Sequence, residues 1–227
     1  MKAVLFDIDG TLVKVGGAGR EALARAVAVT LGVPVKVARE AALRLDFRGR
    51  TDTLLIDQIV EGVGGRAPTL DPRIIGAYLG ILDEVLADAR LEVMPGVAAV
   101  LQALEARDDV VVGLLTGNLR EGARRKLAPF GLGYLADRPG GFGEDGRERQ
   151  DVARAAVGRL ANRRVEPRRV VVVGDTEHDV AAAKSAGARA VAVATGWTAP
   201  EVLRDCGADL ALADLAGPEL LALIETL

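Results

Sequence analysis

The sequence has little of the residues that support thiol chemistry or histidine-rich metal sites. Its 227 residues include a single cysteine, Cys206, and a single histidine, His178. One thiol cannot form a disulfide within the chain or a cysteine cluster around a metal, and it is consistent with a reducing compartment. We expect Cys206 to be a buried and chemically inert side chain.

The chain also lacks an excess of either charge. It carries 29 basic and 32 acidic side chains, for a formal net charge of −3. Without a basic field or a polybasic segment, we expect no binding to nucleic acid or to a membrane surface. No apolar run approaches the ~18 residues that a membrane-spanning helix needs, and Asp7 comes too early for the apolar core of a signal peptide. We therefore predict a cytoplasmic protein.

Hydrophobic residues make up 50% of the chain, enough for one domain with a small accessory domain. Short apolar runs without polar alternation occur at 3–6, 110–115, 170–173 and 190–194. Strands that are buried on both faces of a parallel sheet have this pattern. Trp197 follows the last run, and we expect it to serve in packing.

Helix-length segments with apolar residues at three- and four-residue spacing lie between these runs, at 97–106, 120–128 and 152–160. The repeated order of strand and helix predicts an α/β fold with a doubly wound, Rossmann-like parallel sheet. Ligands of such folds bind beyond the carboxyl ends of the strands. The residues that follow each apolar run are therefore the candidates for function.

One block interrupts the alternation. From about residue 13 to residue 92 there is almost no strand pattern, and helical patterns occur instead, notably at 20–31 and 74–86. We predict a core domain formed by residues 1–15 and 92–227 and an inserted α-helical domain formed by residues 16–91. The glycine-rich segment 16–19 and Met94-Pro95-Gly96 are the expected hinges.

Acidic residues follow two of the predicted strands, in Asp7-Ile8-Asp9-Gly10-Thr11 and in Gly174-Asp175-Thr176-Glu177-His178-Asp179. Because the carboxyl ends of parallel strands meet at one edge of the sheet, we expect the side chains of Asp7, Asp9, Asp175 and Asp179 to gather there. Carboxylates so close together raise one another's pKa or require a cation, and oxygen ligands suit Mg²⁺. A single Asp-x-Asp could equally cap a turn or a helix.

A third strand, at 110–115, is followed by Thr116-Gly117-Asn118 and then by a helix. Helix N-termini offer free N–H groups and a partial positive charge, and glycine allows the backbone to approach a ligand closely. The segment therefore suits a phosphate group, although the same residues also form ordinary capped turns.

Together these motifs resemble those of the haloacid dehalogenase superfamily of phosphohydrolases. That pattern has Asp-x-Asp-Gly-Thr after the first strand, Thr or Ser after the second, a Lys or Arg, and Gly-Asp-x-x-x-Asp. The resemblance covers residues 1–13 and 94–196, with the inserted helices as the cap domain that such enzymes often carry.

The third motif departs from the commonest form, because no Lys-Pro precedes the last motif. We assign the cation to Arg149, just ahead of a helix that we expect from about Asp151. Arg147 is the alternative, and an arginine in this segment could also be a solvated surface residue.

The resemblance implies that Asp7 attacks phosphorus and is transiently phosphorylated, while Asp9 protonates the leaving alkoxide and then activates water. It implies a magnesium ion held by Asp7, the backbone carbonyl of Asp9 and Asp175, with Asp179 orienting a ligand or water. Thr116 and Arg149 would assist catalysis, and Gly117 and Asn118 would bind the substrate. The implied function is a phosphatase of small phosphoesters.

Other functions share parts of this pattern. A phosphosugar mutase would also use Asp7 and Asp9 and is the nearest alternative. A dehalogenase has no need of Asp9, and the large insertion fits a non-enzymatic phospho-accepting module badly. His178 has no role in the implied mechanism, so we interpret it as a polar residue at the start of a helix.

The inserted domain carries Phe47-Arg48-Gly49-Arg50-Thr51-Asp52, which resembles the cap segment facing the active site of phosphoglycolate phosphatase-like enzymes. A small anionic phosphoester of the phosphoglycolate type is the substrate that this implies. The fork of Arg50 suits a substrate carboxylate, and a bridge to a cap acid such as Asp52 is the alternative.

Overall fold

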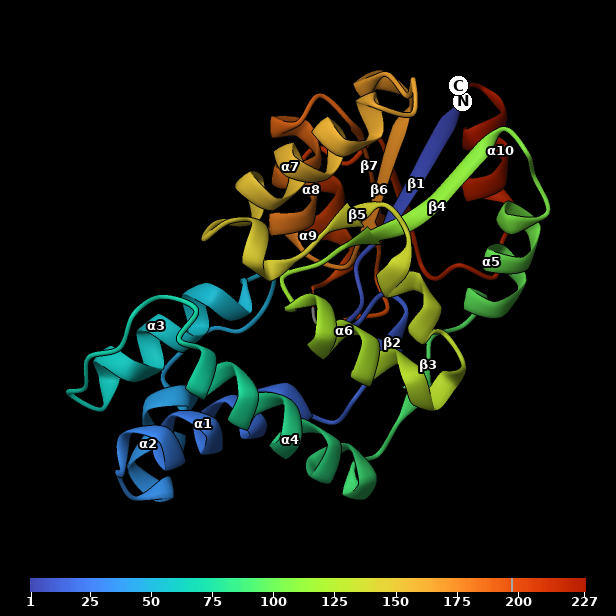
Figure 1. The fold of residues 1–227 in the computed structure, drawn as a ribbon. Coiled ribbons are helices and arrows are strands. Elements are labelled where there is room, and N and C mark those ends of the chain that lie inside the picture. Colours follow the sequence, from blue (N-terminus) through green and yellow to red (C-terminus); the bar gives the residue numbers. More distant parts are fainter. Residues whose placement is uncertain (197) are drawn as a thin grey trace.

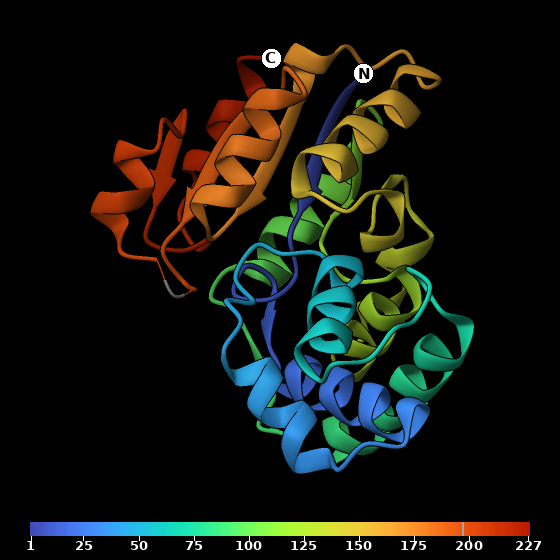
Figure 2. The same cartoon turned by 90° about the vertical axis from the view of Figure 1, so that its left-hand side faces the viewer.

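The computed structural model describes residues 1–196 and 198–227 of the chain (Figure 1). Trp197, which we expect to serve in packing, lies outside the described residues. The chain forms a layered α/β part and a block of helices, and Figures 1 and 2 show that block at the end of the molecule opposite the two termini.

The α/β part is built on a six-stranded parallel sheet with the order β5-β4-β1-β6-β7-β8. The predicted strands form its middle, and the edges are shorter. The strands are β1 (Lys2–Phe6), β4 (Val110–Leu115), β5 (Gly140–Gly141), β6 (Val170–Gly174), β7 (Arg189–Val193) and β8 (Leu210–Leu212). The predicted fold class is confirmed.

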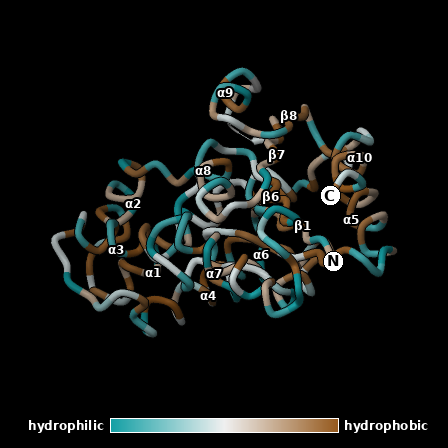
Figure 3. Tube along the Cα trace, turned by 90° about the horizontal axis from the view of Figure 1, so that it is seen from above, coloured by the Kyte–Doolittle hydropathy of each residue, from teal (hydrophilic) through white to brown (hydrophobic). Residues whose placement is uncertain are grey.

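Side chains of β1 show why this strand has an unbroken apolar sequence. Val4 and Phe6 pack into the core on one face of the sheet, and Ala3 and Leu5 pack into the core on the other. All of them are fully buried, because a central parallel strand is covered by helices on both faces. Figure 3 shows the hydrophobic strands β6 and β7 running between the flanking helices.

Helices cover both faces of the sheet (Figure 1). One face carries α5 (Val97–Glu105) and α10 (Glu219–Glu225), and the other carries α7 (Arg149–Ala161), α8 (Glu177–Ser185) and α9 (Pro200–Asp205). α6 (Arg120–Leu127) follows β4 and contacts the helical block. Short 3₁₀ segments lie at Ala128–Phe130, Gly133–Asp137, Gly143–Asp145 and Pro167–Arg169.

The helical block consists of α1 (Ala18–Leu31), α2 (Val35–Leu43), α3 (Asp52–Gly62) and α4 (Pro72–Asp88). Two short antiparallel strands, β2 (Val13–Lys14) and β3 (Glu92–Val93), join it to the rest of the chain. Gly17 follows β2 and Gly96 follows β3, where the chain enters and leaves the helical block. Both adopt the left-handed backbone conformation, with φ of 83° and 80°, which favours glycine. The division into core and cap domains stays a prediction.

Two sequence-based expectations need adjustment. α7 begins at Arg149 rather than near Asp151, so Arg149 lies in its first turn and not ahead of it. Cys206 is partly exposed rather than buried, and its thiol contacts the carbonyl of Leu203. Within the described residues, no helix has the length and apolar character needed to span a bilayer.

Candidate active site

The carboxyl ends of three neighbouring strands bring the predicted site residues together. Asp7 follows β1, Thr116 follows β4 and Asp175 follows β6, and β1 lies between the other two strands in the sheet. The N–H of Asp7 continues the ladder by donating to the carbonyl of Val173 at 2.9 Å. Segments more than 100 residues apart in the chain therefore meet because the strands are paired.

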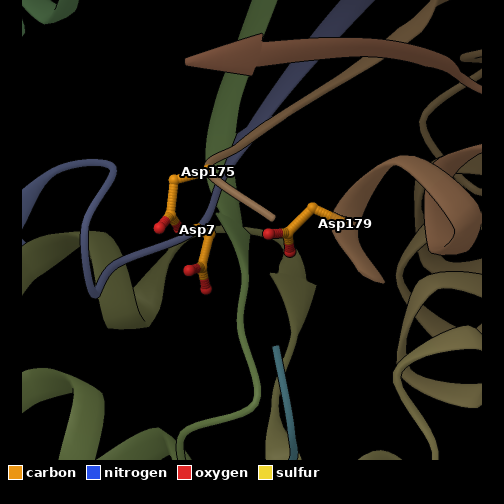
Figure 4. A group of neighbouring side chains, drawn as sticks. All are labelled: Asp7, Asp175 and Asp179. Carbon is orange, nitrogen blue, oxygen red and sulfur yellow. The ribbon is translucent and has the colours of Figure 1, made fainter. Parts of the chain in front are cut away.

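Three carboxylates form a cluster at this edge of the sheet (Figure 4). Asp7, Asp175 and Asp179 each present an oxygen, and these oxygens lie within 4.8 Å of one another. Burial raises the pKa of Asp7 to about 6; Arg149 opposes this rise, and the charges of Asp179 and Asp9 add to it. Burial and the neighbouring charges of Asp179 and Asp7 raise the pKa of Asp175 to about 8. The protein surroundings of the cluster therefore do not fully stabilise the ionised forms of its carboxyl groups.

Arg149 is the cation of this cluster. Its Nη2 donates to Asp7 Oδ1 at 2.7 Å and to the carbonyl of Leu115 at 3.0 Å, and it also pairs with Asp179. The guanidinium is 4% exposed, and both carboxylates raise its pKa despite its burial. Arg147, the alternative, pairs instead with Asp57, and half of its side chain is exposed. Of the two arginines, the structure brings Arg149 against Asp7.

The donor set fits a hard divalent cation. All the ligand atoms of the cluster are carboxylate oxygens, which suit such ions. Among the described residues, Asp175 Oδ2 is buried and has no hydrogen-bond partner, a state that a cation would relieve. Asp179 has a structural role as well, because its Oδ2 accepts from the N–H and the hydroxyl of Thr176 at the start of α8.

The carboxylate of Asp9 lies outside the cluster. Its Oδ2 accepts from Asn118 Nδ2 at 2.8 Å and from Lys126 Nζ at 2.7 Å. The predicted metal contact of Asp9 was its backbone carbonyl, and this contact stays a prediction. The side chain instead faces the residues that follow β4.

The three residues that follow β4, 116–118, differ in their access to the cavity at the strand ends. Gly117 and Asn118 line the cavity that also exposes Asp7 and Asp9. Thr116 is fully buried and does not line it, and its hydroxyl oxygen accepts from Asn118 Nδ2 at 2.8 Å. Among these residues, Gly117 and Asn118 are thus the ones within reach of a ligand.

This cavity has a volume of about 950 Å³ and lies between the strand ends and the helical block. Cationic side chains from the helical block and from the segments that join it to the sheet line this cavity, namely Lys14, Arg20, Arg48, Arg50 and Arg90. Arg48 pairs with Asp46, whereas Arg50 makes no side-chain hydrogen bond or ion pair within the described residues. The alternative partner for Arg50, Asp52, is engaged elsewhere.

Helix α3 is docked directly onto the segment after β4. The N–H of Asp52 donates to the carbonyl of Gly117 at 2.7 Å, and the carboxylate of Asp52 accepts from the N–H of Leu119 at 2.9 Å. A Cβ on Gly117 would lie 1.9 Å from the carbonyl oxygen of Arg50, so only glycine permits this approach. The predicted cap segment therefore closes over the predicted substrate-binding segment.

His178 does not line the cavity. His178 lies in the first turn of α8. Its side chain packs closely against Gly49, since a Cβ added to Gly49 would lie 2.5 Å from the Cβ of His178. This contact agrees with the interpretation of His178 as a residue without a catalytic role.

Our sequence reasoning missed two buried charged residues beside Asp9. Lys126 on α6 contacts Asp9 and Asn118, and Asp52 contacts Leu119 and the hydroxyl of Tyr78. Burial raises the pKa of Asp52 to about 6, against the effect of Lys126. A signal for Lys126 exists in the sequence, because it shares a helical face with Ala123 and Leu127 and thus takes a position where a core residue is expected.

Known proteins resemble this chain over most of its length. A family model for haloacid dehalogenase-like hydrolases matches residues 1–187. The chain is 33% identical over 202 residues to the phosphoglycolate phosphatase of Rhodospirillum rubrum, a match covering 87% of this chain and 81% of that protein. It is 29% identical over 197 residues to the phosphoglycolate phosphatase of Synechococcus elongatus, with 87% and 85% covered.

A solved structure shows the same fold. A hydrolase from Pseudomonas syringae matches with a TM-score of 0.69 at 18% identity, over 99% of each chain. The chain belongs to the haloacid dehalogenase-like hydrolase family, because the family model covers more than half of its residues. The predicted enzyme class, a phosphatase, is confirmed by this family and by the two curated relatives.

Proposed function

We propose that this protein is a magnesium-dependent phosphomonoester hydrolase that forms an aspartyl phosphate on Asp7. The observation that carries the proposal is the pairing of Asp7 with the buried Arg149 at a cavity that also exposes Asp9. With a pKa of about 6, Asp7 is mainly ionised near neutral pH, as a nucleophile must be. Asp9 lies two residues further along and is the available acid for the leaving group.

Each residue at the strand ends has a place in this reaction. Asp7 attacks phosphorus, and Arg149 holds its carboxylate and stabilises the charge that spreads over the phosphoryl oxygens. Asp9 gives a proton to the leaving oxygen and takes one from the water that hydrolyses the aspartyl phosphate. The backbone of Gly117 and Asn118 binds the phosphoryl group, while the side-chain amide of Asn118 donates to Asp9 and to the hydroxyl oxygen of Thr116.

Magnesium would be held by the carboxylates of Asp7 and Asp175 and by the backbone carbonyl of Asp9, with Asp179 orienting a ligand or water. Bound there, the ion supplies charge that screens the phosphoryl oxygens from the carboxylates. The unpartnered oxygen of Asp175 and the raised pKa values of Asp7 and Asp175 support this assignment.

The substrate we propose is a small anionic phosphoester of the phosphoglycolate type. Two observations support it: the curated relatives are phosphoglycolate phosphatases, and Arg50 lines the cavity without a side-chain partner among the described residues. The planar fork of an arginine matches a carboxylate.

The test is release of inorganic phosphate from a panel of phosphoesters that includes 2-phosphoglycolate, a sugar phosphate and nitrophenyl phosphate. We expect turnover with Mg²⁺, its loss on chelation and its return when the ion is restored. Chelator-resistant hydrolysis would contradict the metal assignment. Isomerisation of the sugar phosphate without phosphate release would instead identify a mutase.

A further inference from the structure

Lys126 is a buried lysine with no role in the mechanism described so far. It lies on α6, it is 5% exposed, and its ammonium group donates to Asp9 Oδ2 at 2.7 Å and to Asn118 Oδ1 at 2.5 Å. Asn118 Nδ2 donates to the same oxygen of Asp9 at 2.8 Å. Lys126, Asn118 and Asp9 therefore form a closed triangle of hydrogen bonds.

A buried ammonium group destabilises the fold unless it is paired, so the partners of Lys126 must explain how its charge is tolerated. Burial lowers the pKa of Lys126, but the carboxylates of Asp9 and Asp52 outweigh this effect and raise it overall. Asp52 is itself held by the N–H of Leu119. The lysine is thus a stable cation between one carboxylate of the core and one of α3.

The triangle treats the two oxygens of Asp9 differently. Oδ2 accepts both described hydrogen bonds, from Asn118 and from Lys126, and Oδ1 accepts none from the described residues. An oxygen that already accepts two donors, one of them a cation, is a poor site for a further proton. A proton on this carboxyl group therefore resides on Oδ1. The side chain of Asp9 lines the cavity and is 41% exposed.

We propose that Lys126 is a positioning residue for Asp9, which it holds through Oδ2 so that Oδ1 carries the proton exchanged with the leaving group. This proposal rests on the proposed function, in which Asp9 is the acid. Asn118 shares the task, and the close approach of α1 encloses the lysine, since a Cβ on Gly19 would lie 3.0 Å from its Nζ.

The test separates two esters by how much acid assistance their leaving groups need. The alkoxide leaving group of 2-phosphoglycolate needs a proton, whereas nitrophenolate leaves without one. Single-turnover measurements, with saturating Mg²⁺ and with enzyme in saturating excess over ester, would follow release of each alcohol in the wild type and in Lys126→Met. We expect Lys126→Met to slow release from 2-phosphoglycolate by about 10²-fold, the lower range for lost acid catalysis, and release of nitrophenolate by less than about threefold.

Two further variants serve as controls for this result. Lys126→Gln keeps an N–H donor without the charge, and we expect it to show the same selectivity with a smaller loss, of about tenfold. Lys184→Met makes the same substitution at a surface lysine that pairs with Asp209, and it should leave both rates within twofold. Thermal melting would establish that each variant is folded, and Lys126→Gln carries the test if Lys126→Met does not fold.

Three outcomes would overturn the proposal. Equal losses on both esters would indicate a purely structural role for Lys126, and normal rates on both would indicate no role. A raised KM for 2-phosphoglycolate with an unchanged single-turnover rate would make Lys126 a substrate-binding residue. In all three cases the wild type still hydrolyses the esters, so the proposed function stands; a wild type that hydrolyses neither ester refutes both proposals.

Discussion

The two walls of the cavity differ in how their charged side chains are held. On the wall formed by the strand ends, the core wall, Asp7 and Arg149 are buried and hydrogen-bonded to each other, and Arg149 is also hydrogen-bonded to Asp179. On the wall formed by the helical block, the cap wall, Arg50 makes no side-chain hydrogen bond or ion pair with any described residue. Arg20 makes a stacking contact, its guanidinium lying 4.6 Å from the centre of the Phe47 ring, and no hydrogen bond or ion pair to the described part of the chain. Both walls carry arginine, but the arginines without an ion-pair partner among the described residues, Arg20 and Arg50, lie on the cap wall, where Arg48 alone is seen paired, with Asp46.

This difference indicates a division of tasks. Charges that are fixed before the substrate arrives can stabilise a transition state without reorganisation, as the reacting phosphoryl group requires. Arginines without partners keep their hydrogen-bond donors for a ligand, as recognition of a substrate anion requires. We therefore expect substitutions on the core wall to change the rate and those on the cap wall to change the affinity.

The largest expected effect is that of Asp7→Asn. The amide has the shape of the carboxylate but is not a nucleophile, so we expect phosphate release to fall by at least about 10⁴-fold, as when other nucleophiles are removed. Circular dichroism should show an unchanged fold. A variant that keeps a near-normal rate would contradict the covalent mechanism.

Arg149→Ala should have the next largest effect. Loss of a preorganised donor lowers kcat by about 10²–10³, or roughly 2.7–4 kcal/mol, and Arg149→Lys should recover part of this because it restores the charge without the planar fork. Arg147→Ala is the matched control: half of its side chain is exposed and it pairs with Asp57 rather than with Asp7, so kcat should change by less than twofold. The opposite pattern would move the catalytic cation to Arg147.

On the cap wall, Arg50→Ala should raise KM for 2-phosphoglycolate about tenfold, equivalent to about 1.4 kcal/mol, with kcat nearly unchanged. The KM for nitrophenyl phosphate, which lacks the carboxylate, should stay the same. Arg44→Ala, at an exposed position outside the cavity, is the control. Equal losses on both esters would exclude Arg50 from the recognition of the carboxylate.

The smallest effect concerns stability, measured by thermal melting at pH 5 and pH 8 with and without Mg²⁺. Asp7 and Asp175 have a pKa of about 6 and about 8 in the folded chain, against 3.8 as the ordinary value. At these two groups the folded chain binds protons more tightly than the unfolded chain does, so their contribution to the stability of the metal-free protein is complete below pH 4 and is lost as the pH rises toward 8.

Magnesium should offset this loss. At a hundredfold excess over its dissociation constant an ion stabilises by about 2.7 kcal/mol, which corresponds to about 5–10 °C in Tm for a chain of this size. The increase should be larger at pH 8 than at pH 5 and should disappear in Asp175→Asn. An increase of equal size in that variant would place the ion elsewhere.

Much of the fold is readable from the chain, and the exceptions have a common cause. The strands at 3–6, 110–115, 170–173 and 190–194 are found because their burial on both faces requires an unbroken apolar sequence. The edge strands β5 and β8 are not predicted from the sequence, because β5 is a pair of glycines and β8 is only partly buried, so neither has the unbroken apolar pattern of a buried strand.

The candidate site divides in the same way. Asp7 and Asp175 are predictable because each follows a strand, and strand pairing alone brings strand ends together. Arg147 and Arg149 are not distinguishable by pattern, since both precede or begin the same helix. In the structure α7 starts at Arg149, and the side chain of Arg149 is the one that contacts Asp7; its catalytic role stays a prediction.

By itself, the sequence determined which segments become buried strands and which acids follow them, because burial and strand periodicity act over a few residues. Only the tertiary structure decided that Lys126 and Asp52 lie beside Asp9, since a helical stripe shows that a residue faces inward but not what it meets there. Whether a buried charge is tolerated depends on its partners, and these come from α3, α6 and the end of β1, which only packing brings together.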